Sequence, residues 1–77
     1  MKWVSVESSV FWAAAYNEDE HSLYLKFHSG EVYRYFSVPV QRYTEFLAAD
    51  SKGRYFRANI LDRFAYERMQ GAWRAAS

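Results

Sequence analysis

The stretch LYLKFHSGEVYRYF, residues 23–36, decides the fold because two apolar stretches flank a turn that contains glycine. In residues 23–27 apolar side chains alternate with Tyr and Lys, which is the period of a strand with one buried face. Residues 31–36 are again rich in aromatic and β-branched side chains, and only residues 28–30 lie between the two stretches. The pattern predicts an antiparallel hairpin.

The length of the turn decides which side chains of the second strand face the core. A two-residue loop would place Arg34 on the apolar face beside Leu25, and burial of an arginine is costly. A three-residue loop, with Gly30 in the left-handed position of a bulge, pairs Phe27 with Glu31 instead and turns Arg34 outward. We prefer this second register. Its core face carries Leu23, Leu25, Phe27, Tyr33 and Tyr35.

A further strand is predicted over residues 9–16, although its three alanines would also suit a helix. After the hairpin, Pro39 suits the first residue of a helix that runs to about Ala49, and Ser51 suits the N-cap of a second helix. The apolar stripes of the two helices are Val40, Tyr43, Phe46 and Leu47, and then Phe56, Ile60 and Phe64.

These elements predict an α+β fold, a three-stranded antiparallel β-meander followed by two helices packed on one face of the sheet. A chain of 77 residues forms a single domain, residues 1–77, whose compact part is about 8–66. Residues 67–77 form a C-terminal tail without a clear period. The tail continues the second helix, drapes over the core or frays, and its sequence does not decide between these alternatives.

The absence of cysteine excludes a disulfide framework and a cysteine-ligated metal site, and it favours a cytoplasmic protein. The N-terminal residues do not resemble a signal peptide, and no apolar run approaches the roughly 20 residues that span a bilayer. We therefore expect a cytoplasmic protein with no membrane segment.

Residues that could support catalysis are not grouped into any known motif. His21 and His28 lie at opposite ends of one predicted strand, which disfavours a shared metal. Neither a nucleophile elbow nor a glycine-rich phosphate loop occurs, and Asp19 and Glu20 lie in a polar turn where both carboxylates stay solvated. We predict that the protein is no enzyme and holds neither a cofactor nor a metal.

Charge is distributed unevenly along the chain. Residues 1–33 hold two cations and five carboxylates, whereas residues 34–77 hold eight cations, seven of them arginine, and four carboxylates. Such a split favours an anionic partner, although solvated helix faces produce the same pattern.

Two places combine cations with a means of holding a polyanion. On the outer face of the hairpin, Lys26 and Arg34 lie beside Tyr24, a mixture typical of proteins that bind single-stranded nucleic acid. At the start of the second helix, Lys52 and Arg54 lie where free N–H groups and the helix dipole attract an anion. Ordinary capping by Ser51 also explains that second stretch.

The order of several short motifs resembles the KTSC domain, a short bacterial domain marked by a central Tyr-x-Tyr. The resemblance covers about residues 8–66 and rests on Tyr33–Tyr35, Val38–Pro39, Leu47–Ala49 and Ser51–Phe56. The family occurs as free-standing small proteins and at the C-terminus of some lysyl-tRNA synthetases, and this fusion implies RNA as a partner.

Two positions depart from the family pattern. Arg57 replaces a usual Asn and adds a cation beside the second helix. Phe64-Ala65-Tyr66 replaces Tyr-Pro-Tyr and lacks the proline that would stop this helix, which allows a longer or less sharply ended helix here.

We therefore expect a non-catalytic domain that binds RNA or another polyanion. The predicted contacts are Lys26, Arg34, Lys52, Arg54 and Arg57. The alternative is a protein-interaction module, for example a homodimer formed along a free strand edge or through the aromatics Trp3, Trp12 and Trp73.

Overall fold

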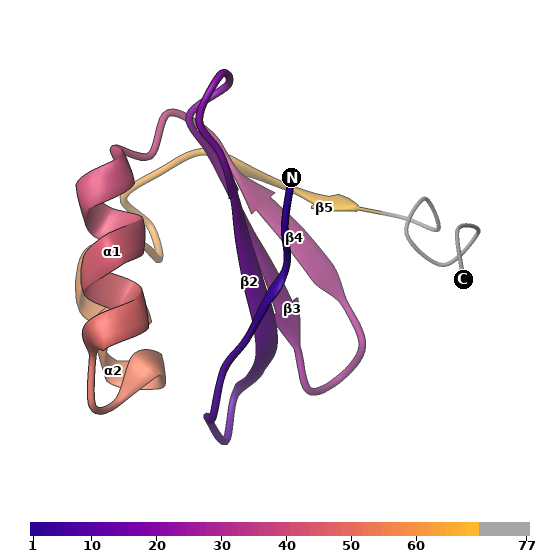
Figure 1. Ribbon diagram of the computed structural model, residues 1–77, viewed down its shortest axis with the longest axis vertical. Helices are drawn as coiled ribbons and strands as arrows, with labels where there is room; N and C mark the ends of the chain where they lie inside the picture. Colours follow the sequence, from indigo (N-terminus) through magenta and orange to yellow (C-terminus); the bar gives the residue numbers. More distant parts are fainter. Residues whose placement is uncertain (70–77) are drawn as a thin grey trace.

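A computed structural model describes residues 1–69 of the chain as one sheet covered on one face by two helices (Figure 1). In chain order the elements are β1 (Val4–Ser5), β2 (Phe11–Asn17), β3 (Ser22–Phe27), β4 (Val32–Tyr35), α1 (Val40–Ala48), α2 (Lys52–Asn59) and β5 (Tyr66–Met69). The strands follow the order β1-β2-β3-β4-β5, and each pairs antiparallel with its neighbour. The predicted α+β class and the antiparallel meander are confirmed, but the sheet has five strands where three were predicted.

The β3–β4 hairpin has the predicted register. The amide of Phe27 donates to the carbonyl of Glu31 at 2.9 Å, and Gly30 has φ of +95°, so the loop is the three-residue one with a left-handed glycine. Arg34 pairs with Tyr24 on the face that the helices leave uncovered. The face toward the helices carries Leu23, Leu25, Phe27, Tyr33 and Tyr35, as predicted.

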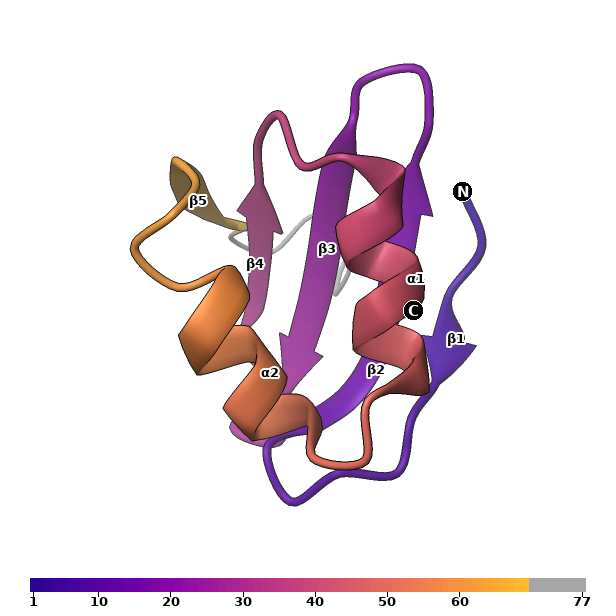
Figure 2. The ribbon, with the colours of Figure 1, turned by 90° about the vertical axis from the view of Figure 1, so that its left-hand side faces the viewer.

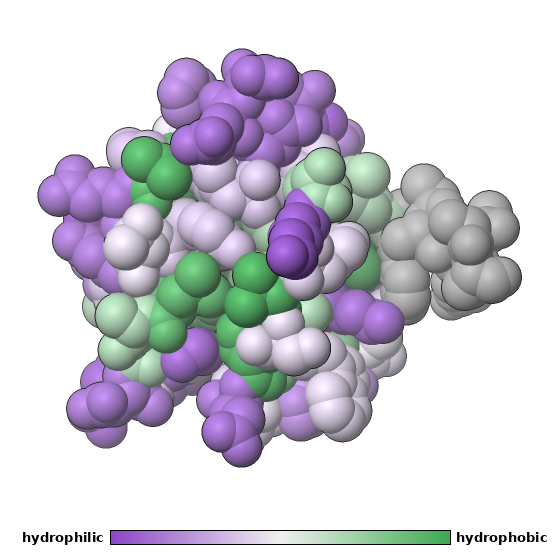
Figure 3. Space-filling model, viewed as in Figure 1, coloured by the Kyte–Doolittle hydropathy of each residue, from purple (hydrophilic) through white to green (hydrophobic). Residues whose placement is uncertain are grey.

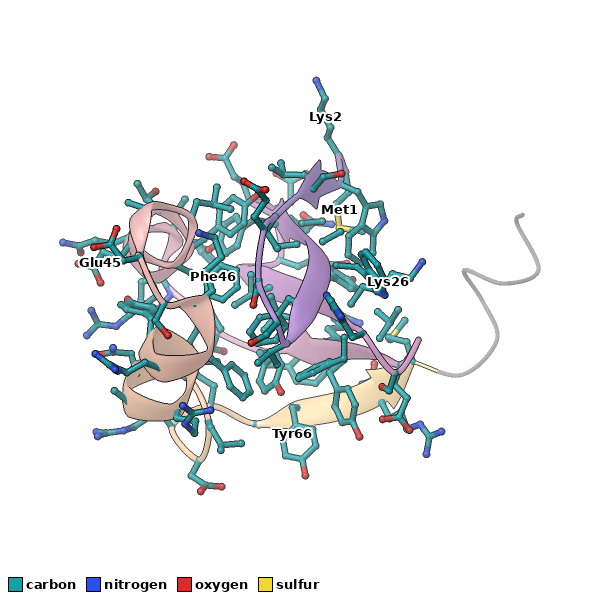
Figure 4. The ribbon with its side chains drawn as sticks, turned by 90° about the horizontal axis from the view of Figure 1, so that it is seen from below. Met1, Lys2, Lys26, Glu45, Phe46 and Tyr66 are labelled. Atoms are coloured by element: carbon teal, nitrogen blue, oxygen red, sulfur yellow. The ribbon has the colours of Figure 1, made fainter. Side chains whose placement is uncertain are left out.

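Phe11 of β2 joins the sheet to both helices. Its fully buried ring meets the ring of Phe46 of α1 at 5.3 Å and that of Phe56 of α2 at 5.4 Å, both edge to face. Figure 4 shows Phe46 pointing from α1 toward the sheet while its neighbour Glu45 points away. The two helices lie side by side on the sheet (Figure 2). The sheet and the helices therefore share one aromatic core.

The helices begin close to the predicted places. Pro39, predicted as the first residue of α1, is its N-cap, so the helix begins one residue later than predicted; Ser51 caps α2 as predicted. The prediction that Val40 is buried is wrong, because its side chain is 47% exposed. Val40 precedes the buried Phe46 by six positions, which turns it about 120° away from the core-facing line of the helix.

The predicted continuation of α2 through Phe64 is also wrong. The helix ends at Asn59, the amide of Leu61 donates to the carbonyl of Phe56, and Asp62 takes a positive φ. These features turn the chain back to the sheet, where residues 66–69 form β5 beside β4 instead of a helical, draped or frayed tail. The remaining tail, residues 70–77, lies outside the described residues. Neither of the helices described in residues 1–69 is long and apolar enough to cross a membrane.

The hairpin register yields a prediction about Gly30. A Cβ at this position would meet no atom within 4 Å, so Gly30→Ala costs stability through its positive φ alone, by about 1 to 2 kcal/mol. Gly30→Asn should cost less, since asparagine tolerates a left-handed backbone better. Urea unfolding of the two variants checks this order, and an alanine variant as stable as the parent would contradict the assigned loop.

Candidate polyanion-binding surface

The start of α2 is held by the side chain of the residue before it. Ser51 Oγ accepts a hydrogen bond from the amide of Arg54 at 3.3 Å, which fixes the first turn of the helix. Lys52, Gly53 and Arg54 make up this turn, and the first amides of a helix carry the positive end of its dipole. The local sequence thus places two cations where the backbone already favours an anion.

Gly53 lets the start of α2 approach the β1–β2 loop closely. A Cβ at this position would lie 3.1 Å from Cγ2 of Val10, tighter than ordinary contact, so a methyl group there would require the Val10 side chain to shift slightly. Between them lies a hollow of about 250 Å³, lined by residues 7–10, residues 50–53 and Arg57. We call this space the α2 hollow. It brings together Lys52 and Arg57, two of the predicted contacts.

The three cations of α2 have no ion-pair partner in the part of the chain that the structure describes. Lys52, Arg54 and Arg57 make no ion pair with any carboxylate of residues 1–69, whereas Arg42 is paired with Glu45 at 3.0 Å. Lys52 Nζ instead donates to the carbonyl of Ala49 at 2.9 Å, which holds the ammonium group beside the helix start. The cations of α2 therefore form no ion pair with the described carboxylates, although Glu7 and Asp50 line the same hollow.

Arg34 lies on the opposite face of the sheet and is tied into a network. Its guanidinium lies 2.7 Å from Glu20 Oε1 and 3.6 Å from Glu67 Oε2, and its Nε donates to Ser22 Oγ at 3.2 Å. The same group lies over the ring of Phe36, 4.6 Å from its centre. Two carboxylates thus offset the charge of Arg34, so the structure gives it a role in joining β3, β4 and β5.

The outer face is less open than a stacking surface requires. Tyr24, which sequence reasoning placed beside Lys26 and Arg34 as an exposed ring, is only 9% exposed and meets the edge of Trp3 at 6.4 Å. The N-terminal segment that leads into β1 supplies this cover, and no pattern in the sequence predicted that strand. Lys26 lies on this face as well, and Figure 4 shows it across the sheet from Phe46.

The five predicted contacts therefore form two separate groups. Lys26 and Arg34 lie on the outer face of the sheet, and the other three lie on α2 on the helix side. One small ligand cannot touch both groups, because the sheet lies between them (Figure 1).

A second hollow on the helix side escaped sequence analysis. It measures about 270 Å³ and lies between β4, β5 and the end of α2, and its walls include Phe27, Tyr33, Tyr35, Phe56, Leu61 and Tyr66. We call it the tyrosine hollow. The Tyr-x-Tyr motif was its one sequence signal, and it supplies only two of the three tyrosines. The third, Tyr66, comes from β5. This strand pairs with β4, although both helices separate the two strands in the sequence.

The described residues offer no arrangement for metal binding. Within residues 1–69 no three side chains among His, Asp and Glu are grouped closely enough to hold an ion. His21 and His28 flank β3 at its two ends, as predicted.

Comparison with known proteins gives a consistent family. The KTSC domain model matches residues 7–64. A protein of Tsukamurella paurometabola is 41% identical over 59 residues, which cover 77% of this chain and 88% of that protein. A lysine–tRNA ligase of Nostoc sp. is 40% identical over 63 residues, or 82% of this chain, but this chain spans only 11% of that enzyme.

A solved structure agrees with the fold. The crystal structure of a KTSC domain protein from Yersinia pestis superposes with a TM-score of 0.86 at 29% identity, covering 88% of this chain and 96% of that one. The resemblance inferred from the motifs is thereby confirmed.

The contrast between the two arginine groups predicts different effects on stability. Arg34→Ala should cost about 1 to 2 kcal/mol, because it removes charge-assisted hydrogen bonds and a ring contact from a side chain that is mostly buried. Arg54→Ala, the matched control on the exposed side of α2, should change stability by no more than about 0.5 kcal/mol. Chemical denaturation measures the free energy of unfolding of both variants. Equal decreases would show that the network around Arg34 stabilises the fold no more than an exposed arginine does.

Proposed function

The chain belongs to the KTSC domain family, and on that premise we propose that it is a non-catalytic domain that binds RNA through the start of α2. The observation that carries the proposal is that three cations of one helix, Lys52, Arg54 and Arg57, make no ion pair with a carboxylate of residues 1–69. Lys52 and Arg54 lie in the first turn of α2, where the helix dipole also attracts phosphate, and the side chain of Arg57 lines the hollow beside that turn. The side-chain charges and the helix dipole therefore both stabilise a polyanion bound at this place.

The choice of RNA among polyanions has separate support. The Nostoc relative is by its name a ligase that acts on tRNA, and it contains a segment similar to most of this chain. Absence of cysteine in the sequence fits a cytoplasmic location, where such a partner occurs. Lys26 and Arg34 enter the proposal only as contacts for an RNA long enough to pass around the edge of the sheet.

A second candidate function is self-association along β1. This strand is a two-residue sheet edge, and it lies beside the exposed side chains of Met1 and Trp3. Figure 3 shows apolar side chains at the surface of the face that carries this edge. The exposed Trp12 also belongs to this candidate, whereas Trp73 lies outside the described residues.

Binding through three phosphate contacts predicts a defined salt dependence. The logarithm of the association constant for a short single-stranded RNA should fall with the logarithm of salt concentration with a slope of about −2. Fluorescence anisotropy at several salt concentrations measures the slope. An affinity that does not change with salt would exclude the proposed phosphate contacts.

Charge reversal locates the contacts. The double variant Arg54→Glu/Arg57→Glu should lose most of the affinity and flatten the salt slope, because two of the three phosphate contacts become repulsive. Arg42→Glu is the matched control, since it reverses a cation on α1 that is already paired with Glu45. If Arg42→Glu reduces RNA affinity by as much per reversed charge, binding depends on the overall charge of the protein and not on α2.

Sedimentation separates the second candidate from the first. If the protein binds RNA as a single chain, its mass should stay near 9.2 kDa as concentration rises. A mass near twice that value, restored to that of one chain by Val4→Lys, would favour a dimer along β1.

A further inference from the structure

Three tyrosines from two adjacent strands surround the tyrosine hollow. Tyr33 and Tyr35 stand on the helix side of β4, and Tyr66 stands on β5 beside them. The ring of Tyr66 lies 5.7 Å from that of Tyr33 and 5.6 Å from that of Tyr35, centre to centre. The hollow thus has a nearly continuous aromatic wall, which extends to Phe27 and Phe56.

Tyr35 is a buried residue whose hydroxyl has no hydrogen-bond partner in the described residues. Only 3% of Tyr35 is exposed, yet its hydroxyl makes no hydrogen bond within residues 1–69, whereas the hydroxyl of Tyr16 donates to the carbonyl of Val38. No buried side-chain oxygen or nitrogen of the described residues is both sealed from solvent and unpaired, so the Tyr35 hydroxyl opens into the hollow that its ring lines. A tyrosine that is almost wholly buried thus keeps an unpaired hydroxyl in contact with solvent, and it lines a space that a ligand can enter.

The protonation state of Tyr35 fits hydrogen bonding to a neutral ligand. Burial raises the pKa of Tyr35 well above its ordinary range, and the neighbouring Tyr33 and Tyr66 raise it further. The phenol therefore keeps its proton at neutral pH and can both donate and accept.

Tyr66 provides the rim of the hollow. It is 55% exposed, and Figure 4 shows it standing out from β5 with its hydroxyl at the surface. A planar ring that enters the hollow can stack on the face of Tyr66 while its polar edge reaches the hydroxyl of Tyr35.

The two hollows lie toward opposite ends of α2. The side chain of Arg57 lines the α2 hollow, and the residue before it, Phe56, lines the tyrosine hollow from another side of the same short helix. Aromatic walls beside unpaired cations are the combination that binds the bases and the phosphates of single-stranded nucleic acid. A phosphate bound at Arg57 would hold the attached base near the tyrosine hollow. This favours a base over an isolated apolar group as its ligand.

We propose that the tyrosine hollow receives one unpaired base of an RNA strand whose phosphates bind at the start of α2. The inference rests on the proposed function and assigns a base-binding role to Tyr33, Tyr35 and Tyr66. The base stacks against Tyr66, and the hydroxyl of Tyr35 hydrogen-bonds to its polar edge. The Tyr-x-Tyr motif then serves both the core and the ligand.

The test compares two strands that differ only in their bases. A short fluorescent oligouridine and a ribose–phosphate strand of the same length without bases are titrated with the full chain by anisotropy. Oligouridine should bind about tenfold more tightly, the effect expected for one stacked base. The strand without bases should still bind in a salt-dependent manner, since its phosphates are unchanged.

Matched variants locate the base. Tyr66→Ala should abolish the difference between the two strands, whereas Trp12→Ala, which removes an aromatic ring of almost equal exposure on β2, should preserve it. Tyr35→Phe keeps the ring and removes the hydroxyl, so it should reduce the difference while leaving the fold intact. Tyr43→Phe on α1 is its control. If Tyr66→Ala fails to fold, the comparison of Tyr35→Phe with Tyr43→Phe tests whether the base binds in the tyrosine hollow.

The outcomes separate this inference from the proposed function. Equal, salt-dependent affinity for the two strands would overturn base binding and leave RNA binding through α2 in place. A difference that survives Tyr66→Ala and Tyr35→Phe, or that is lost in Trp12→Ala, would also overturn it by locating the base elsewhere. If neither strand binds, the proposed function fails and the inference fails with it.

Discussion

The left-handed turn at Gly30 is the constraint on which the rest of the structure depends. It fixes the hairpin so that Phe27 pairs with Glu31, and successive residues of β4 then alternate between two different environments. A slip of one residue would send Arg34 into the aromatic core and would turn Tyr33 and Tyr35 away from the helices. The core, the Arg34 network and the tyrosine hollow all follow from this one register.

The sequence was most informative where the signal is local. Alternation in residues 23–27, the glycine of the hairpin turn and the serine before α2 each act within a few residues, and each prediction drawn from them is confirmed. β1 and β5 were missed because they are short edge strands that exist through pairing with distant segments. No pattern within four residues distinguishes Tyr66–Met69 from a frayed tail.

The same distinction between local and distant contacts applies to the candidate site. Composition alone found the cations, but it could not tell which of them meet a carboxylate, because Arg34 is paired with residues far away along the chain in both directions. Long-range folding offsets the charge of Arg34 and leaves α2 without such partners among the described residues. It also adds Tyr66 to the two tyrosines of the motif. The helix side of the sheet thereby gains both unpaired cations and an aromatic hollow.

The central claim is that the helix side of the molecule, and not the outer sheet face, is the binding surface. Amide chemical shifts of the labelled protein, recorded during titration with a short single-stranded RNA, test it most directly. The account predicts that the largest changes map to residues 52–57 together with Tyr33, Tyr35 and Tyr66. Changes confined to Lys26, Arg34 and the strand β1 would contradict it.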